Sequence, residues 1–376
     1  MEIDWELCRA VGESADRLTS AQVFMSGGAA ELTTRNISKE LYEAARNFHE
    51  EPLTYLAAKA LLERTKPRDP VIITTGFFDP PSMIDESDGP VGAVHFARAL
   101  CAMLDLTPVF LTEVANMGRM EALARAGGLD VVDFEMARLT PFKAAMMPLP
   151  IDPERAASEA KRCMDFIKPA AFVAIEKPAP CPRGRYHTGV GLDVTDVVGK
   201  IDVFVQRAQE SGALTIGFGD GGNEVGMGNI LAAIEDVVPT GKVIGTSVKT
   251  DILVVSSIAN WGAYAVEACL AAALQMPEAI HSRDDERRLL DAAAANGFID
   301  PVTGVANGWI DGTPPICSES ILELLRNMVE LRLLRKARHS LMNFPRRWSE
   351  RNDPTKVLQA WARRLSDDEA RFFSER

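Results

Sequence analysis

Hydrophobic positions along the chain alternate between two patterns. Short, mainly apolar runs are typical of strands buried on both faces of a sheet, and they occur at residues 71–74, 109–111, 131–134, 171–175, 214–216 and 252–255. Between these runs, apolar residues recur every three or four positions, which indicates helices. This rhythm of strand and helix predicts an α/β fold with a doubly wound, mostly parallel sheet flanked by helices.

The same patterns divide the chain into three segments. Residues 1–66 show helical spacing and predict an N-terminal helical segment, whereas residues 67–330 carry the alternating strands and helices, with a proline-marked link around 148–153. Residues 331–376 are basic and again have helical spacing. We interpret this last segment as a helical tail that docks on the acidic body of the protein or on another subunit, and we expect a homo-oligomer.

Composition and charge exclude several classes of protein. The 376 residues are 47% hydrophobic and 25% charged, as in ordinary globular proteins, and no apolar stretch approaches the length that spans a membrane. The net charge of −12 argues against bulk attraction to nucleic acid. The six cysteines include no C-x-x-C pair, and the acidic start of the chain is no signal peptide, so we expect a cytoplasmic protein with reduced thiols.

The most informative stretch is LTIGFGDGGNEVGMGN at residues 214–229. It begins as a buried strand and continues with six glycines, among which stand Asp220, Asn223 and Glu224, before a helical pattern follows. The two acids therefore lie at the carboxyl end of a strand, which is the edge where open α/β sheets bind ligands. If the helix already begins at Asp220, the two carboxylates lie four residues apart on one helical face.

Three interpretations of this loop compete. A dinucleotide site is rejected, because two carboxylates would repel a pyrophosphate and the acid expected about 20 residues further on is absent. A site for Mg²⁺ or Mn²⁺ fits the carboxylate and amide oxygens, and glycines let the backbone come close to an ion. The order G-D-G-x-N-E resembles the metal loop of haloacid-dehalogenase-type phosphatases, but the D-x-D motif of those enzymes is absent. A tight turn whose polar residues cap a helix stays open as the third interpretation.

Other polar residues follow the strand at 171–175. Glu176 and Lys177 come directly after it and lead into a loop that carries Arg183 and Arg185. This basic loop suits a cover over an anionic small molecule, with arginine as the clamp for a carboxylate or phosphate. His187 in the same loop is a candidate general base, although a surface histidine is the simpler interpretation.

Six segments, in order along the chain, resemble a known family. They are TTGF at 74–77, ESDGPVGA at 86–93, IEKP at 175–178, GDGGNEVGMG at 219–228, the strand introduced by Asp251, and NWGAY at 260–264. Together they resemble the D-glutamate cyclase C-terminal-like family over about residues 69–330. Ala179 stands where a glycine is usual in this family.

The resemblance implies an α/β enzyme that depends on Mn²⁺ or Mg²⁺ and acts on a small anionic metabolite. The expected reaction is the cyclisation of D-glutamate to 5-oxo-D-proline and water. The alternatives are a manganese-dependent, phosphatase-type hydrolase of a small phosphate ester and a non-enzymatic sensor of a metabolite or metal. The expected catalytic groups and metal ligands are Asp220, Glu224 and Glu176, with Asp251 as a further metal ligand. The residues expected to bind substrate are Thr75, Gly76, Asp88, Lys177, Arg183, Arg185, Gly221, Gly222, Asn223 and Asn260.

Overall fold

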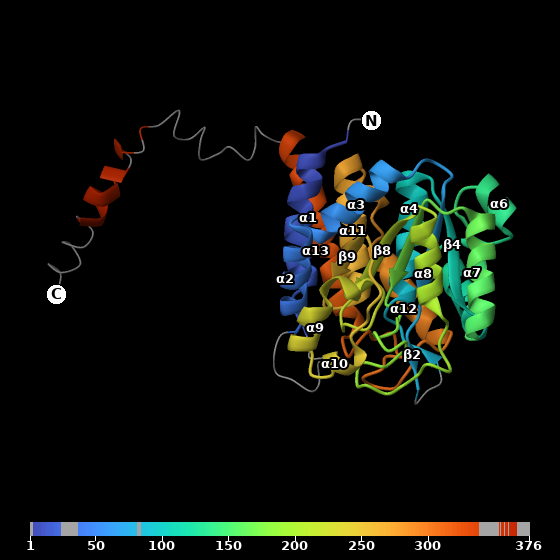
Figure 1. Cartoon of the computed structure of the whole chain (residues 1–376). Coiled ribbons are helices and arrows are strands. Elements are labelled where there is room, and N and C mark those ends of the chain that lie inside the picture. Colours follow the sequence, from blue (N-terminus) through green and yellow to red (C-terminus); the bar gives the residue numbers. More distant parts are fainter. Residues whose placement is uncertain are drawn as a thin grey trace. The chain divides into compact units, whose positions relative to one another are not determined.

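Seven parallel strands form the main sheet of the protein (Figure 1). The computed structural model describes residues 3–23, 37–80 and 84–337, together with 353, 355–356, 358–359 and 361–366. In sheet order the strands are β5 (Asp130–Val131), β6 (Lys143–Leu149), β4 (Thr107–Glu113), β1 (Pro70–Thr75), β7 (Ala171–Ile175), β8 (Leu214–Gly219) and β9 (Ile252–Val255). All neighbours in this order pair in parallel, which confirms the predicted α/β fold.

Helices cover both faces of the sheet (Figure 1). On one face, apolar side chains of the strands join a core with those of α6 (Phe134–Leu139), α7 (Pro153–Ile167) and α8 (Ile201–Glu210). The other face packs against α3 (Leu53–Arg64), α4 (Pro90–Leu104) and α11 (Ala259–Leu274). The remaining helices of the described residues are α1 (Trp5–Thr19), α2 (Ile37–His49), α5 (Met117–Ala126), α9 (Leu231–Val237), α10 (Gly241–Ile244), α12 (Arg283–Ala295) and α13 (Pro315–Ala337), with short 3₁₀ turns between some of them.

The helix α11 is buried along its whole length. Its alanine-rich sequence lets α1, α3 and α4 pack closely around it. The N-terminal helices are therefore tied to the same body as the sheet. The backbone N–H of Asp4 donates to the carbonyl of Ala273 at 2.9 Å, and that of Ser257 donates to Thr19 at 2.8 Å.

By compactness, the chain divides into two units, Met1–Val329 and Glu330–Arg376. The larger unit contains the sheet and the helices that cover it, including α1, α2 and α3. Most of the smaller unit, including the segment around Trp348, lies outside the described residues. The docking of the basic tail therefore stays a prediction.

Two local predictions from the sequence are wrong. The strand expected at 131–134 ends at Val131, and Phe134 begins a helix because the side chain of Asp133 accepts a hydrogen bond from the N–H of Met136 at 3.0 Å. The expected link around 148–153 instead begins inside β6, where Pro148 pairs with Thr112. This proline is tolerated because β5 pairs only with the first two residues of β6, which leaves the other side of Pro148 without a partner strand.

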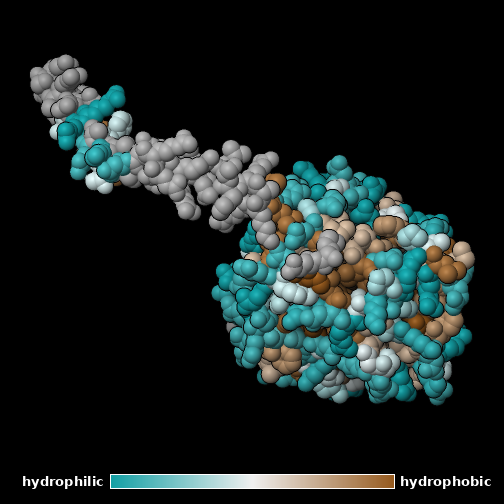
Figure 2. All heavy atoms as spheres, turned by 90° about the horizontal axis from the view of Figure 1, so that it is seen from above, coloured by the Kyte–Doolittle hydropathy of each residue, from teal (hydrophilic) through white to brown (hydrophobic). Residues whose placement is uncertain are grey.

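The surface at the amino ends of the strands faces the viewer in Figure 2. Its described residues are mostly hydrophilic, with apolar side chains gathered near the middle of the view. Exposed apolar patches can serve as association surfaces, and the homo-oligomer stays a prediction. Among the described residues, no helix is long and apolar enough to cross a membrane.

Candidate active site

The chain changes direction across the sheet between β1 and β7. After β1 it forms β4, continues to the edge strand β5 and comes back to β6 between them. It then crosses to β7 on the other side of β1 and continues to β8 and β9. In open α/β sheets, ligands bind at the carboxyl ends of the strands beside such a switch point. Thr75 at the end of β1 pairs with Ile175 at the end of β7. The sheet thus places Glu176 at the switch point, on the side where β2 (Phe78–Asp79) lies in Figure 1.

Three carboxylates converge at this point. One oxygen of each of Asp88, Glu176 and Asp220 lies within 4.8 Å of the other two. Each comes from a different element, because Glu176 follows β7, Asp220 follows β8 and Asp88 precedes α4. Glu176 has a φ of 46°, a left-handed conformation that residues other than glycine adopt rarely. Such local strain is concentrated at functional sites.

Burial and mutual repulsion disfavour the ionised forms of these acids. Burial raises the pKa of Glu176 well above its usual value, and the carboxylates of Asp220 and Glu224 raise it further. Burial also raises the pKa of Asp220 well above its usual value, with Asp311 as the next cause. Burial raises the pKa of Asp88 to about 6, although three backbone N–H groups stabilise its ionised form. Acids that raise one another's pKa in this way mark a candidate site for a cation.

The ligand chemistry of this group fits a hard divalent cation. Carboxylate oxygens are the ligands that Mg²⁺ and Mn²⁺ prefer. Oε2 of Glu176 is buried and has no hydrogen-bond partner among the described residues. Buried polar atoms normally have a partner, so this oxygen is available for an ion. The hydroxyl of Thr75 at the end of β1 is likewise buried without a partner.

Asp88 and Asn260 hold the first turns of two helices against each other. The carboxylate of Asp88 accepts hydrogen bonds from the N–H groups of Ala259 and Asn260, at the start of α11. In return, Oδ1 of Asn260 accepts from the N–H groups of Gly89 and Gly92, at the start of α4. The positive ends of both helix dipoles therefore point toward the carboxylate group, and they favour an anionic ligand there. Both polar atoms of the Asn260 side chain are therefore in use, because Oδ1 caps α4 and Nδ2 donates to the carbonyl of Ser87 at 3.3 Å.

The glycine loop is not helical at Asp220, contrary to the helical alternative drawn from the sequence, and regular α-helix resumes only at Leu231. The carboxylate of Glu224 accepts hydrogen bonds from the N–H groups of Gly221 at 3.0 Å and Gly222 at 2.8 Å. Glu224 therefore shapes the loop from within, and its side chain also contacts Glu176, although it is not one of the three acids whose oxygens lie within 4.8 Å of one another. Its role as a metal ligand stays a prediction.

Asn223 ties the glycine loop to the basic loop that follows β7. Its Nδ2 donates to the backbone carbonyl of His187 at 2.7 Å. The N–H of Ala179 donates to the backbone carbonyl of Asn223 at 2.8 Å. His187 is buried, so the surface interpretation of this residue is wrong, and burial lowers its pKa. The basic loop thus lies beside the glycine loop at the carboxyl end of β8. Substrate contacts by Asn223 stay a prediction.

Lys177 points toward the carboxyl ends of β1 and β4. Its Nζ contacts both carboxylate oxygens of Glu113 at 2.7 and 2.8 Å and donates to the carbonyl of Gly76 at 3.1 Å. Lys177 is buried and its charge is balanced by Glu113. Asp85 belongs to the same neighbourhood, because burial and then Glu113 raise its pKa to about 7 while Lys177 opposes this. Lys177 is therefore beside the site, and a contact with substrate stays a prediction.

Three other predicted site residues are differently placed. Asp251 precedes β9, and its carboxylate accepts from the N–H and hydroxyl of Thr215 near the start of β8. In a parallel sheet this is the amino edge, which the six residues of β8 separate from Asp220 by about 15–20 Å. The prediction that Asp251 shares an ion with Asp220 is therefore wrong. Arg183 and Arg185 are exposed, and Arg185 pairs with Asp193 at 2.6 Å, so their role as a clamp for an anionic substrate stays a prediction.

Two acids of the site escaped the sequence analysis as site residues. Glu86 is buried, and burial, Asp311 and Asp88 raise its pKa well above its usual value. Asp311 belongs to a loop before α13, and it interacts with Asp220 and Asp88. Asp311 has a φ of 48°. The sequence signals only a turn at this position, because Asp-Gly pairs and following prolines favour turns.

The site residues fall within a region shared with known proteins. The sequence matches the family described as D-glutamate cyclase-like, C-terminal, over residues 30–326. The chain belongs to this family. Human mitochondrial D-glutamate cyclase is 28% identical to it over 210 residues, which make up 53% of this chain and 32% of the human protein. The chain therefore matches about a third of the length of that relative, and the residues of the candidate site, from Thr75 to Asp311, all lie within the matched family region.

Proposed function

We propose that the protein is a divalent-cation-dependent enzyme that cyclises D-glutamate to 5-oxo-D-proline with loss of water. The observation that carries the proposal is the convergence of Asp88, Glu176 and Asp220 at the switch point of the sheet. Membership of the D-glutamate cyclase-like family supports the choice of substrate.

Asp88, Glu176 and Asp220 would supply the oxygen ligands for Mn²⁺ or Mg²⁺. When bound, the cation would polarise the side-chain carboxylate of the substrate as a Lewis acid. The start of α4 and the start of α11, held together by Asp88 and Asn260, would favour the second carboxylate of D-glutamate through their dipoles. One carboxylate of the substrate would thus face the cation and the other the helix starts, which would let an acidic site bind an anionic substrate.

The carboxylates of the site would also move the protons that the reaction requires. The substrate nitrogen forms a bond to the side-chain carboxyl carbon, and one oxygen of that carboxyl leaves as water. Two protons pass from the ammonium group to this departing oxygen. Glu176, whose pKa is raised by burial, would accept one proton and return it through the carboxylate oxygen that does not hold the cation.

The test is an activity assay with two matched variants. Asp220→Asn keeps the size of the side chain but removes a charge from the carboxylate group, so we expect catalysis with Mn²⁺ to fall at least about a hundredfold. Asp251→Asn makes the same change at an aspartate that also contacts β8 but lies at the opposite edge of the sheet. We expect its activity to stay within about twofold of the wild type. Product formation from D-glutamate is followed chromatographically, with L-glutamate as the stereochemical control.

The two variants should also differ in stability. Because burial and acidic neighbours raise the pKa of Asp220, its replacement by Asn should raise the melting temperature of the metal-free protein while it abolishes the stabilisation by Mn²⁺. Wild-type activity and wild-type Mn²⁺ stabilisation in Asp220→Asn would sink the proposal. Turnover of phosphate esters without turnover of D-glutamate would favour the hydrolase alternative, and binding without turnover would favour the sensor.

A further inference from the structure

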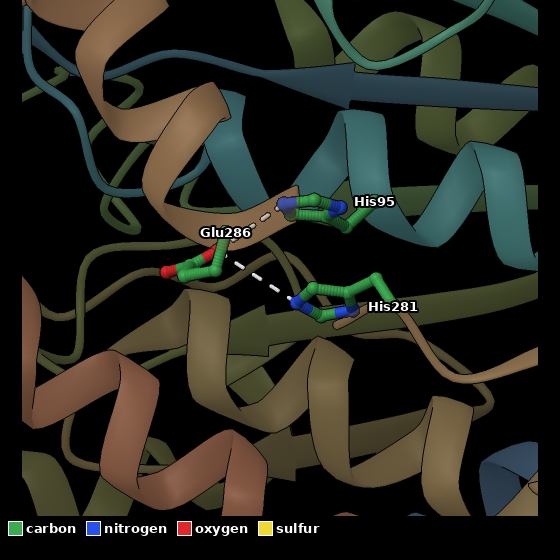
Figure 3. Close-up of side chains that lie close together, drawn as sticks. All are labelled: His95, His281 and Glu286. Atoms are coloured by element: carbon green, nitrogen blue, oxygen red, sulfur yellow. Dashed lines mark ion pairs between the residues drawn. The ribbon is translucent and has the colours of Figure 1, made fainter. Parts of the chain in front are cut away.

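A second group of side chains with the chemistry of metal ligands lies between α4, α11 and α12. His95 is on α4, Glu286 is on α12, and His281 lies just before α12 (Figure 3). All three are buried, and one ligand atom of each lies within 4.8 Å of the other two. Figure 3 shows that both imidazole rings direct a nitrogen toward the carboxylate of Glu286.

The spacing of these atoms suits a small dication. Nε2 of His95 lies 3.2 Å from Oε2 of Glu286, and Nε2 of His281 lies 3.7 Å from the same oxygen. Around a tetrahedral Zn²⁺ whose ligands lie at about 2.0–2.1 Å, two ligand atoms are about 3.3 Å apart. The two histidine–glutamate separations are therefore already close to those that such an ion imposes.

Three of the four ring nitrogens of the two histidines make no hydrogen bond within the described part of the chain. They are the two nitrogens of His95 and Nε2 of His281. The contacts of the two rings with Glu286 are close, but they do not have hydrogen-bond geometry. A buried polar atom without a partner destabilises the fold. Coordination would satisfy Nε2 of both histidines at once. This is a reason, independent of the clustering, to expect a ligand here.

Neighbouring side chains on α11 support the candidate ligands. Nδ1 of His281 lies 2.7 Å from Oε2 of Glu267, and this contact orients the ring so that Nε2 faces Glu286. The hydroxyl of Tyr264 donates to the two carboxylate oxygens of Glu286 at 3.1 and 3.0 Å. Carboxylate contacts to the second nitrogen of a ligating histidine are usual in metal sites. The two buried carboxylates carry charges that a dication would neutralise when both imidazoles are neutral.

We infer that His95, His281 and Glu286 form a closed site for a transition-metal dication of the Zn²⁺ class. The two rings are stacked, with centroids 3.7 Å apart and planes at 12°, so their lone pairs run nearly parallel. Ion binding therefore tilts one ring about χ2, a torsion with a broad minimum. The competing occupant is a proton, which would make one of the rings an imidazolium between Glu267 and Glu286.

The position of this site indicates a structural role. It joins α4, α11 and α12 in the interior, where substrate has no access. Asp88 and Asn260, which bring the first turns of α4 and α11 together, precede His95 and Tyr264 by seven and four residues. An ion in this site would fix the two helices whose ends build the carboxylate site. The inference does not depend on the proposed cyclase reaction.

The first test identifies the ligands of bound zinc by X-ray absorption. The full chain carries Asp220→Asn, so that the carboxylate site is disabled, and is refolded with Zn²⁺ and dialysed. We expect about one equivalent of retained zinc, with nitrogen at about 2.0–2.1 Å and the outer-shell scattering of imidazole. Zinc without imidazole scattering, or no retained zinc, overturns the inference in favour of a proton in the cluster.

The second test compares histidine and glutamate variants in the same background. We expect His281→Gln to lose the ion, and Glu267→Gln to bind it 10–100-fold more weakly, because only the support of His281 is lost. The control is His49→Gln on α2, whose ring accepts from the N–H of Leu253 outside the cluster, and it should keep full affinity. Circular dichroism establishes that each variant is folded. If His281→Gln fails to fold, an unchanged zinc affinity in Glu267→Gln overturns the inference.

Discussion

Asp16 is a buried acid whose role lies outside the active site. It belongs to α1, and its carboxylate accepts hydrogen bonds from the N–H groups of Leu53 and Thr54, at the start of α3. Pro52 precedes this helix and offers no side-chain cap. Asp16 therefore supplies from another helix the N-terminal cap that the sequence around α3 lacks. The hydroxyls of Thr54 and Tyr42 complete its partners.

The pKa of Asp16 predicts how stability depends on pH. Burial raises this pKa from 3.8 to about 6, although the hydrogen bonds oppose the rise. A raised pKa in the folded state means that the contribution to stability is complete below pH 3.8 and is lost as the pH rises through 6. Between pH 4.5 and 7, the wild type should therefore lose about 2 kcal/mol of unfolding free energy relative to Asp16→Asn.

Urea unfolding at several pH values measures this difference. The control is Asp165→Asn, because the exposed Asp165 pairs with Lys161 and its pKa is lowered by that hydrogen bond. A lowered pKa has the opposite effect on the pH dependence of stability. The wild type should therefore lose no stability relative to Asp165→Asn as the pH rises. A pH-independent difference between the wild type and Asp16→Asn would show that Asp16 is ionised in both states.

Individual acids also mark how far the sequence could lead. The positions of Asp220 and Glu176 at the ligand-binding edge of the sheet were predictable, because each residue directly follows a buried apolar run. Asp251 precedes its strand, and the same rule places it at the other edge, so this error was avoidable. The proximity of Asp311 to Asp220 was not predictable, because it depends on the tertiary placement of a loop far along the chain.

At the scale of elements, the approach of α4 to α11 depends on a glycine. A Cβ atom at Gly92 would lie 2.4 Å from Oδ1 and 2.9 Å from Cα of Asn260. The second contact is with backbone, so rotation of the asparagine side chain cannot relieve it. Gly92 therefore permits the helix starts to meet, and with them the caps made by Asp88 and Asn260.

Gly92→Ala should separate these two helix starts. We expect the unfolding free energy to fall by about 1–3 kcal/mol, because the helices must shift to accept the methyl group. Activity supported by Mn²⁺ should fall as well, since Asp88 moves with the start of α4. Gly118→Ala in α5 is the matched control, because no heavy atom lies within 4 Å of the added Cβ and alanine favours a helix by up to about 1 kcal/mol. Equal stability of the two variants, by urea unfolding, would contradict this role of Gly92.

The elements themselves were largely predictable from local pattern. The strands β7 and β9 have the expected bounds, because their apolar runs are unbroken. The strand β6 was missed because its sequence, KAAMMPL, contains neither β-branched nor aromatic residues and includes a proline. Its strand conformation comes from pairing with β4, a tertiary contact that local pattern does not record.

For the whole molecule, the sequence predicts the class of sheet but not the order of its strands. The alternation of strand and helix specifies parallel pairing, whereas the switch point depends on whether the chain returns to β1 after β6. This return brings β7, and with it Glu176, beside Thr75. The function of the carboxylate group therefore depends on a property that only the complete fold determines.

The last helix shows where the body of the protein ends. The part of α13 up to Val329 contributes four buried apolar side chains, which are Ile321, Leu322, Leu325 and Val329. The hydroxyl of Ser318 accepts from the indole N–H of Trp261 at 2.9 Å. Among the described residues, Val329 is the last buried apolar side chain of the chain. This agrees with the division of the chain after Val329 into two compact units. The core of the larger unit therefore needs α13 but not the residues beyond it.

Two shortened chains test this boundary. A chain that ends at Ala337 keeps every described side chain of the core, so we expect a melting temperature within a few degrees of the full chain and unchanged activity. A chain that ends at Pro314 removes α13, uncovers Trp261 and deletes four buried apolar residues at about 2–5 kcal/mol each, which together exceed the usual stability of a domain. It should not fold cooperatively in thermal melts followed by circular dichroism. A loss of cooperative melting in the chain that ends at Ala337 would show that residues beyond α13 belong to the fold.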